Sequence, residues 1–376
     1  MEIITFTSNE IANPEMNIGE LFNQAANANI FEDYKERKTA NTKTRHEKEL
    51  RNFSDFLTNC KYANEGMTTP QEWSGITHGI IEGYQRYMLQ QGYSVNSTNQ
   101  TLYIIKAYAG LAGKAGFIDY VELARIKEVK GYKSGEARNI DKERKAQGAD
   151  TRISTKKETA RSLTESQVYA LKRWEKKGND YSPMELTTLR EKRDALIFAL
   201  FLDMGLRESE LMSLTRESFD IESEMLHWYR EKTNNRGHET MSKAVRLAAR
   251  EYFKVYDSVK DEIRSGNAAH NESARNENKK LNAKSDLFAA INQWGQITGG
   301  ISMRGLQAIV KAAGETIGIN NLSPHDLRHS MALRAYLAGV PLKSIQRRLG
   351  HSTVKTTERY IDIEALDRYN DFDRDF

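Results

Sequence analysis

The residues most suited to chemistry lie in the last third of this chain. His325 and Arg328 fall within the run His-Asp-Leu-Arg-His of residues 325–329, and Tyr360 follows a further histidine, His351, by nine residues. Imidazoles exchange protons near neutral pH, and a guanidinium keeps its charge. Gathered around a phenolic oxygen, these groups would suit transfer of a phosphoryl group to tyrosine without a metal ion.

Two more candidate cations precede this group. Arg207 lies in the run Gly-Leu-Arg-Glu-Ser-Glu-Leu of residues 205–211, and Lys232 lies in Arg-Glu-Lys-Thr of residues 230–233. In this order and spacing the motifs resemble those of the tyrosine recombinase (phage integrase) family, which breaks and rejoins DNA through a phosphotyrosine bond. The resemblance is good over residues 160–365 and loose over residues 40–120.

The two arginines suit a phosphoryl transfer because a planar guanidinium can donate two hydrogen bonds to non-bridging oxygens. Arg207 and Arg328 are therefore the candidates for stabilising the extra negative charge of the transition state. An ordinary phenol has a pKa of ~10, so neighbouring cations or a base must make Tyr360 easier to ionise.

The resemblance implies a role for each remaining residue. Tyr360 would be the nucleophile and Lys232, favoured over Lys243, the general acid for the leaving 5′ oxygen. His325 would accept the proton of Tyr360, and His351 would donate to the phosphate. The supporting residues would orient these groups: Glu210 as a partner of Arg207, together with Asp326 and His329.

Three simpler interpretations compete with this one. Tyr360 could be a core aromatic, His325 and His351 could bind a metal, and residues 340–352 could form a helix-turn-helix that reads DNA. A metal pair is disfavoured because it lacks a third ligand at short spacing and because the arginines would repel the ion. We therefore expect neither a metal nor a cofactor.

The resemblance predicts a site-specific DNA recombinase or integrase: a phage integrase, a transposon integrase (both of mobile elements) or a chromosome-dimer resolvase. It would act through a 3′-phosphotyrosine intermediate and a Holliday junction. Its partners would be double-stranded recombination sites, homotypic protomers forming a tetramer on DNA, and accessory DNA-bending proteins from the host or the element, with no membrane. The alternatives are a type IB topoisomerase-like DNA-relaxing enzyme and a non-catalytic DNA-binding accessory protein of the same fold.

The composition is that of a soluble globular protein, and a basic body with an acidic tail fits a polyanionic partner. The chain has 376 residues, 39% hydrophobic and 29% charged, with a formal net charge of +4. Residues 361–376 carry 2 basic and 6 acidic side chains, which leaves a net charge of +8 on residues 1–360. Cys60 is the single cysteine, and the longest apolar run, residues 195–202, is too short to span a bilayer. We expect a cytoplasmic protein, associated with the nucleoid when bound to DNA.

The elements that must position these residues fit into two domains, because a chain of 376 residues is long enough for each to bury its own core. Apolar spacing predicts a mainly α fold with a small antiparallel β-sheet, in which the first domain is a small helical one. The resemblance implies that this is a core-binding domain and that a mixed α+β catalytic domain follows it. The predicted boundaries are an N-terminal arm or tail (1–40), the core-binding domain (41–124), a basic interdomain linker (125–160), the catalytic domain (161–365, with a polar insertion at 259–286) and an acidic C-terminal tail (366–376).

Local signals predict four elements of the second domain. A capping box at Thr164–Gln167 opens a helix that runs to about Lys176, and a buried helix at 193–204 ends at a left-handed Gly205. Alternating residues predict strands at 225–230 and 239–245, separated by the turn-prone residues 234–237.

Overall fold

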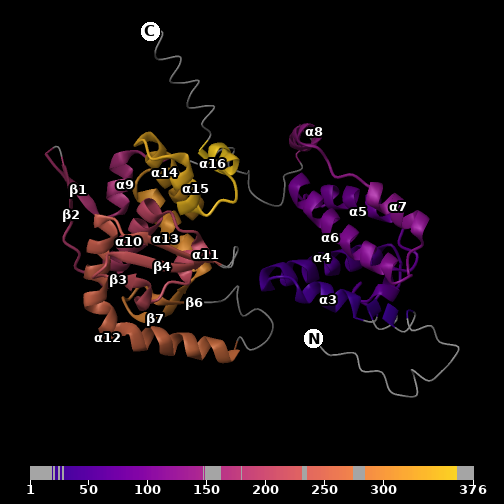
Figure 1. Cartoon of the computed structure of the whole chain (residues 1–376), viewed down its shortest axis with the longest axis horizontal. Coiled ribbons are helices and arrows are strands. Elements are labelled where there is room, and N and C mark those ends of the chain that lie inside the picture. Colours follow the sequence, from indigo (N-terminus) through magenta and orange to yellow (C-terminus); the bar gives the residue numbers. More distant parts are fainter. Residues whose placement is uncertain are drawn as a thin grey trace, which may run out of the picture. The chain divides into compact units, whose positions relative to one another are not determined.

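The computed structural model describes residues 19, 22–23, 26–27, 29–146, 148, 162–178, 180–230, 235–273 and 284–361. The chain divides into two compact units, Met1–Lys156 and Lys157–Phe376, which are described separately below. Figure 1 labels the helices and strands of both units. Three predictions fall wholly or mostly outside the described residues: the arm at 1–40 (apart from its last part), Lys232 and the tail at 366–376.

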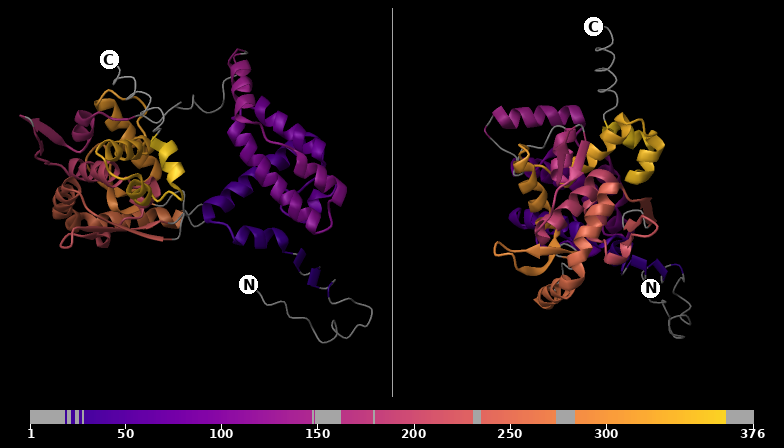
Figure 2. Two further views of the ribbon diagram at one scale, coloured as in Figure 1. Left: turned by 45° about the horizontal axis from the view of Figure 1, so that its top comes forward. Right: turned by 90° about the vertical axis from the view of Figure 1, so that its left-hand side faces the viewer.

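The N-terminal unit is helical throughout its described part, as Figure 2 shows in its left-hand view. Trp73, Tyr108 and Phe53 are fully buried at its centre, and their rings pack against one another or against shared aromatic neighbours. The elements are α3 (Ile30–Glu36), α4 (Ala40–Asn59), η1 (Pro70–Trp73), α5 (His78–Gln90), α6 (Val95–Lys114), α7 (Tyr120–Glu128) and α8 (Ser134–Ala146).

The prediction of a mobile basic linker over residues 125–160 needs correction for residues 125–146, most of which are helical and belong to the N-terminal unit. The helix α7 continues to Glu128, and α8 covers Ser134–Ala146. Arg144 attaches α8 to the bundle, because its guanidinium donates to the carbonyl oxygens of Leu89 (2.8 Å) and Tyr93 (2.9 Å). The apolar content that marks most helices is low in α8, and a charged side chain provides part of its attachment instead.

The C-terminal unit places helices around three small antiparallel sheets, counted over the residues that the structure describes. The prediction of a mainly α fold with antiparallel β-structure is confirmed. Its elements are α9 (Glu165–Leu171), β1 (Trp174–Lys177), β2 (Asp180–Pro183), α10 (Leu189–Ala199), η2 (Leu200–Met204), α11 (Glu208–Met212), η3 (Arg216–Ser218), β3 (Phe219–Asp220), β4 (Met225–Arg230), β5 (Asn235–Thr240), α12 (Lys243–Ser273), β6 (Lys284–Ile291), β7 (Ile297–Ser302), α13 (Met303–Thr316), α14 (Pro324–Leu337), α15 (Leu342–Leu349) and α16 (Val354–Ile361).

The predicted buried helix over 193–204 is confirmed, with one refinement. Thr188 caps α10 in a capping box with Glu191, and the last turn, η2, is π-helical. Every residue from Ala195 to Met204 is buried except Asp203. Gly205 then ends the segment at φ 64°, the left-handed conformation that glycine adopts without a Cβ penalty.

Three local predictions need correction, and one element had no prediction. The helix opened by Thr164 ends at Leu171 instead of Lys176, because Arg173 turns the chain at φ 59° into the β1–β2 hairpin. The second predicted strand lies at Asn235–Thr240 instead of 239–245. Residues 259–273 of the predicted insertion extend α12, where Ile263 is fully buried. The β6–β7 hairpin was not predicted.

No helix in the described ranges is long and apolar enough to cross a membrane.

Candidate active site

The predicted site residues, Lys232 apart, come from four segments of the C-terminal unit. Arg207 is the N-cap of α11, directly after the turn at Gly205. His325 and Arg328 lie on α14, and His351 follows α15 after the left-handed Gly350 (φ 61°). Tyr360 lies on α16. The helices α14, α15 and α16 lie side by side (Figure 1), so residues up to 153 positions apart in the sequence reach one site.

Arg328 connects the two glycine turns of the site. Its side chain is 6% exposed, and its two terminal nitrogens donate to the carbonyl oxygens of Gly205 and Leu349. Burial, followed by repulsion from Arg207, lowers the pKa of Arg328 to about 10, which still leaves it charged at neutral pH. Arg328 is therefore both a cation of the site and a structural link between η2 and α15.

A single carboxylate lies among three arginines. Glu210 is 4% exposed and accepts hydrogen bonds from Arg207, at 2.7 Å from Nη1 and 2.9 Å from the backbone nitrogen. Its oxygens also lie 3.8 Å from Arg328 Nη1 and 3.8 Å from Arg230 Nε. Arg207 also donates to the carbonyl oxygen of Gly350 (3.1 Å), and its side chain is the most accessible of the three, at 27% exposed.

This arrangement has a direct consequence for stability. Glu210→Gln should lower the free energy of unfolding by about 3 kcal/mol, because three guanidinium groups would lose their shared counter-charge in a buried site. Urea unfolding measures the loss, and inorganic phosphate should recover part of it by supplying negative charge. Glu208→Gln is the matched control: burial raises the pKa of Glu208, so removing its charge should cost little. Equal losses in the two variants would contradict the shared counter-charge.

The ring of Tyr360 is surrounded by three histidines. The rings of His325, His329 and His351 lie edge-on to it, with centroids 5.2, 5.3 and 5.2 Å away. Burial raises the pKa of Tyr360 to about 12, although Arg328 and Arg207 oppose the rise. The phenol is therefore neutral at pH 7, and attack on phosphorus requires its proton to be removed.

The histidines are held in different ways. His351 Nδ1 lies 3.1 Å from Thr357 Oγ1, on the helix that carries Tyr360. His325 is exposed, and its backbone oxygen lies 3.5 Å from the Tyr360 hydroxyl. Asp326 is buried and caps α14, accepting from Ser323 N (2.8 Å) and Oγ (2.6 Å). Asp326 thus fixes the start of the helix on which His325 and Arg328 lie.

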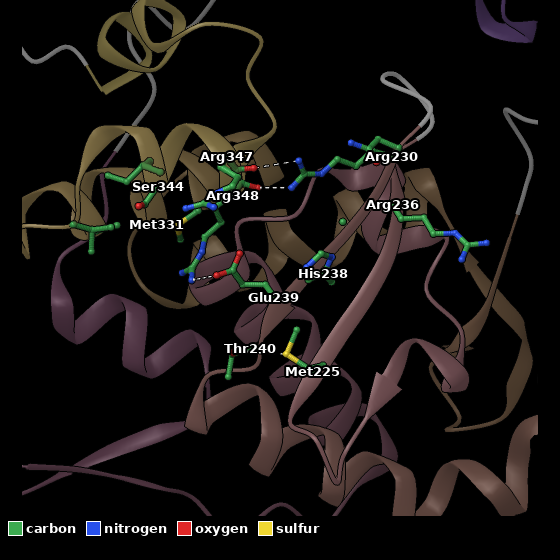
Figure 3. A pocket seen from close by; sticks show the side chains of 15 residues that line it. Met225, Arg230, Arg236, His238, Glu239, Thr240, Met331, Ser344, Arg347 and Arg348 are labelled. Atoms are coloured by element: carbon green, nitrogen blue, oxygen red, sulfur yellow. Dashed lines mark hydrogen bonds and ion pairs between the residues drawn. The ribbon is translucent and has the colours of Figure 1, made fainter.

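Sequence reasoning gave Arg230 no role, yet it lies 3.8 Å from Glu210. A signal was available: Leu226 and Trp228 are the buried positions of an alternating strand, and Arg230 continues their row. Figure 3 shows its side chain directed towards α15. A charged side chain on the inward face of a strand needs hydrogen-bond or ionic partners there, so an arginine at this position indicates a polar cluster under the sheet.

Residues 183–366 match the phage integrase family. The chain is 30% identical over 175 residues to the tyrosine recombinase XerC of Thermodesulfovibrio yellowstonii, covering 46% of this chain and 51% of that protein. It is 27% identical over 187 residues to XerA of Saccharolobus solfataricus, covering 50% and 52%. The chain thus spans about half the length of these curated relatives. A lambda integrase dimer bound to a core site shares the fold, with a TM-score of 0.50, 12% identity and coverage of 94% and 83%.

Proposed function

Because this chain belongs to the phage integrase family of tyrosine recombinases, we propose that it is a site-specific DNA recombinase that breaks and rejoins strands through a 3′-phosphotyrosine intermediate. One observation carries the proposal: Arg207, Arg328 and Arg230 lie around one buried carboxylate, in the same unit in which the Tyr360 ring contacts three histidine rings. With one negative and three positive charges, this cluster is suited to bind a further negative group.

In the proposed cleavage step, the Tyr360 oxygen attacks the scissile phosphorus while the bond from phosphorus to the 5′ oxygen breaks. His325 accepts the phenolic proton, and Lys232 gives a proton to the departing 5′ oxygen. The products are a phosphotyrosine ester at the 3′ end and a free 5′ hydroxyl. In rejoining, a 5′ hydroxyl attacks the ester and the protons return by the same routes.

The arginines stabilise the transition state in this scheme. Arg207 has the most accessible guanidinium of the three and would bind a non-bridging oxygen directly, while Arg328 contributes positive charge from its buried position. His351, held near Thr357, would donate to a second oxygen. Because these groups are fixed before DNA arrives, they need little reorganisation during the reaction.

Strand exchange extends the same chemistry to two duplexes. We propose that four protomers assemble on two recombination sites and exchange strands in two rounds through a Holliday junction. The helical N-terminal unit would contact one side of each duplex. Accessory DNA-bending proteins from the host or the element would help to bring the two sites together.

The reaction should not require a divalent metal, because guanidinium groups supply the positive charge that Mg²⁺ lends in other phosphoryl transfers. We expect an SDS-stable protein–DNA adduct to form at an undiminished rate in excess EDTA. The substrate is a library of duplexes with a randomised centre and a nick, so that cleavage frees a short strand and the adduct accumulates.

Adduct formation in EDTA, followed by sequencing of the captured DNA, would support a sequence-specific recombinase. Loss of the adduct in EDTA with recovery in Mg²⁺ would point to a metal-dependent nuclease instead. Capture without sequence preference, combined with relaxation of supercoiled plasmid, would favour the topoisomerase alternative. DNA binding with no adduct under any condition would favour the non-catalytic accessory protein.

A further inference from the structure

Arg230 ends the inward-facing row of β4 and lies over an aromatic ring. Its guanidinium carbon lies 5.3 Å from the ring centroid of Trp228, and its side chain is 13% exposed. Trp228 is held in turn against Gly237 of β5, its partner in the sheet register, where a Cβ would lie 2.4 Å from the indole. The strand pair therefore fixes the direction in which Arg230 leaves the hairpin.

The guanidinium of Arg230 reaches the end of α15. Its Nη1 donates to the carbonyl oxygen of Arg347 (3.2 Å) and its Nη2 to that of Arg348 (2.7 Å), as Figure 3 shows. The last carbonyl groups of a helix have no partner within the helix, so a cation is favourable there. Gly350 allows this approach, because a Cβ on it would lie 2.6 Å from Arg230 Nη1.

A third contact connects Arg230 to the cation cluster. Its Nε lies 3.8 Å from Glu210 Oε1 and, within the described residues, is buried without a hydrogen-bond partner. One planar group thus touches the end of α15, the turn before His351 and the carboxylate that supports Arg207. A lysine could not do the same, because an ammonium has no planar fork and is shorter in reach.

Lys232 follows Arg230 by two residues in the sequence. We propose that Arg230 is a positioning residue: it fixes the end of β4, two residues before Lys232 in the sequence, against Gly350, which precedes His351, and against Glu210. Without this anchor, the chain would enter the segment that carries the proposed leaving-group acid from an unrestrained strand end. This inference rests on the proposed function. It assigns no direct phosphate contact to Arg230, whose two terminal nitrogens bond to α15.

The test separates proton delivery from the rest of catalysis. It compares two captured duplexes that differ only at the 5′ bridging atom of the scissile phosphate, oxygen or sulfur. A thiolate leaves far more readily than an alkoxide and needs no proton, since thiol pKa values are ~8.5. Cleavage by full-length protein bound to each substrate at saturation is followed over a single turnover, so that DNA affinity does not enter.

Arg230→Met should slow cleavage of the oxygen substrate by about 10²-fold, the lower end of what general acid catalysis contributes. It should slow cleavage of the sulfur substrate by less than about threefold, because the thiolate leaves without a proton from a general acid. Arg230→Lys should show the same selective defect in milder form, and it guards against a Met variant that does not fold. Arg236→Met is the matched control, an exposed arginine on the same hairpin, and should cleave both substrates normally.

An equal slowing of the two substrates by the Arg230 variants would overturn the proposal, as would rates equal to those of Arg236→Met. Lys232→Ala serves as the benchmark. If sulfur fails to rescue Lys232→Ala, the general-acid assignment in the proposed function is wrong. The role of Arg230 is then still decided by the ratio of the cleavage rates that its variants show on the oxygen and the sulfur substrate.

Discussion

Tyr360→Phe should abolish the covalent protein–DNA adduct while leaving DNA binding unchanged. The substitution removes only the phenolic oxygen, which lies 3.5 Å from the backbone carbonyl of His325 and also hydrogen-bonds the Arg328 side chain, a group that its own carbonyl partners hold in place. The ring and its edge-on contacts with the three histidines remain. We therefore expect a folded protein with no measurable cleavage, measured as SDS-stable adduct on the captured nicked duplex.

Tyr336→Phe provides the matched control, since Tyr336 lies on α14 and packs on the same small apolar cluster as Tyr360. It should form the adduct at the wild-type rate. An adduct formed by Tyr360→Phe would assign the nucleophile to another residue. Loss of DNA binding by Tyr360→Phe would show that the hydroxyl serves binding and would leave the chemical role unsupported.

Arg328→Lys should reduce cleavage by about 10³-fold or more, within the range known for arginines that stabilise phosphoryl transfer. Charge is retained, so the loss must come from geometry. An ammonium cannot reach the carbonyl oxygens of Gly205 and Leu349 together, so both glycine turns lose a restraint. Single-turnover cleavage measures the rate, and urea unfolding measures the accompanying loss of stability.

Arg334→Lys, on the same helix, tests whether any arginine of α14 matters equally. Arg334 is 34% exposed and makes a 3.3 Å bond to the carbonyl oxygen of Leu202. Its replacement should change the cleavage rate less than about tenfold, since lysine keeps the charge that faces Asp203 at 3.9 Å and partly exposed pairs contribute little. A rate for Arg328→Lys close to that of Arg334→Lys would contradict a catalytic role for the Arg328 fork.

Much of this organisation could be predicted because the signals are local. The capping box at Thr164, the strand at Met225–Arg230 and the left-handed Gly205 each depend on residues within one turn or strand, and each is confirmed. The family followed from motif order, and the comparisons bear it out. The roles of the individual site residues remain predictions, Lys232 among them.

The rest depends on contacts that no local pattern encodes. Glu210 meets Arg328 across 118 positions, and Arg230 meets the carbonyl of Arg348 across the same separation. The helix α8 was missed because it is charged and has few apolar residues, whereas Arg144 attaches it to a loop and a helix about 50 residues earlier. Polar tertiary contacts of this kind can stabilise a helix whose sequence has no apolar periodicity, so the pattern of the sequence does not predict it.

The double use of Arg328 bears on how such a protein could lose its activity in evolution. Replacing Arg328 with an uncharged residue removes a cation of the site and also the bonds to the turns at Gly205 and Leu349, so the variant loses both activity and stability. The Tyr360 hydroxyl bonds the Arg328 side chain and lies 3.5 Å from the His325 carbonyl, but it does not join two turns of the fold. Descendants that survive as inactive DNA-binding proteins should therefore have lost the tyrosine first and retained the arginines. A homologue with the arginine cluster intact and the tyrosine replaced would be one that lost its cleavage activity recently.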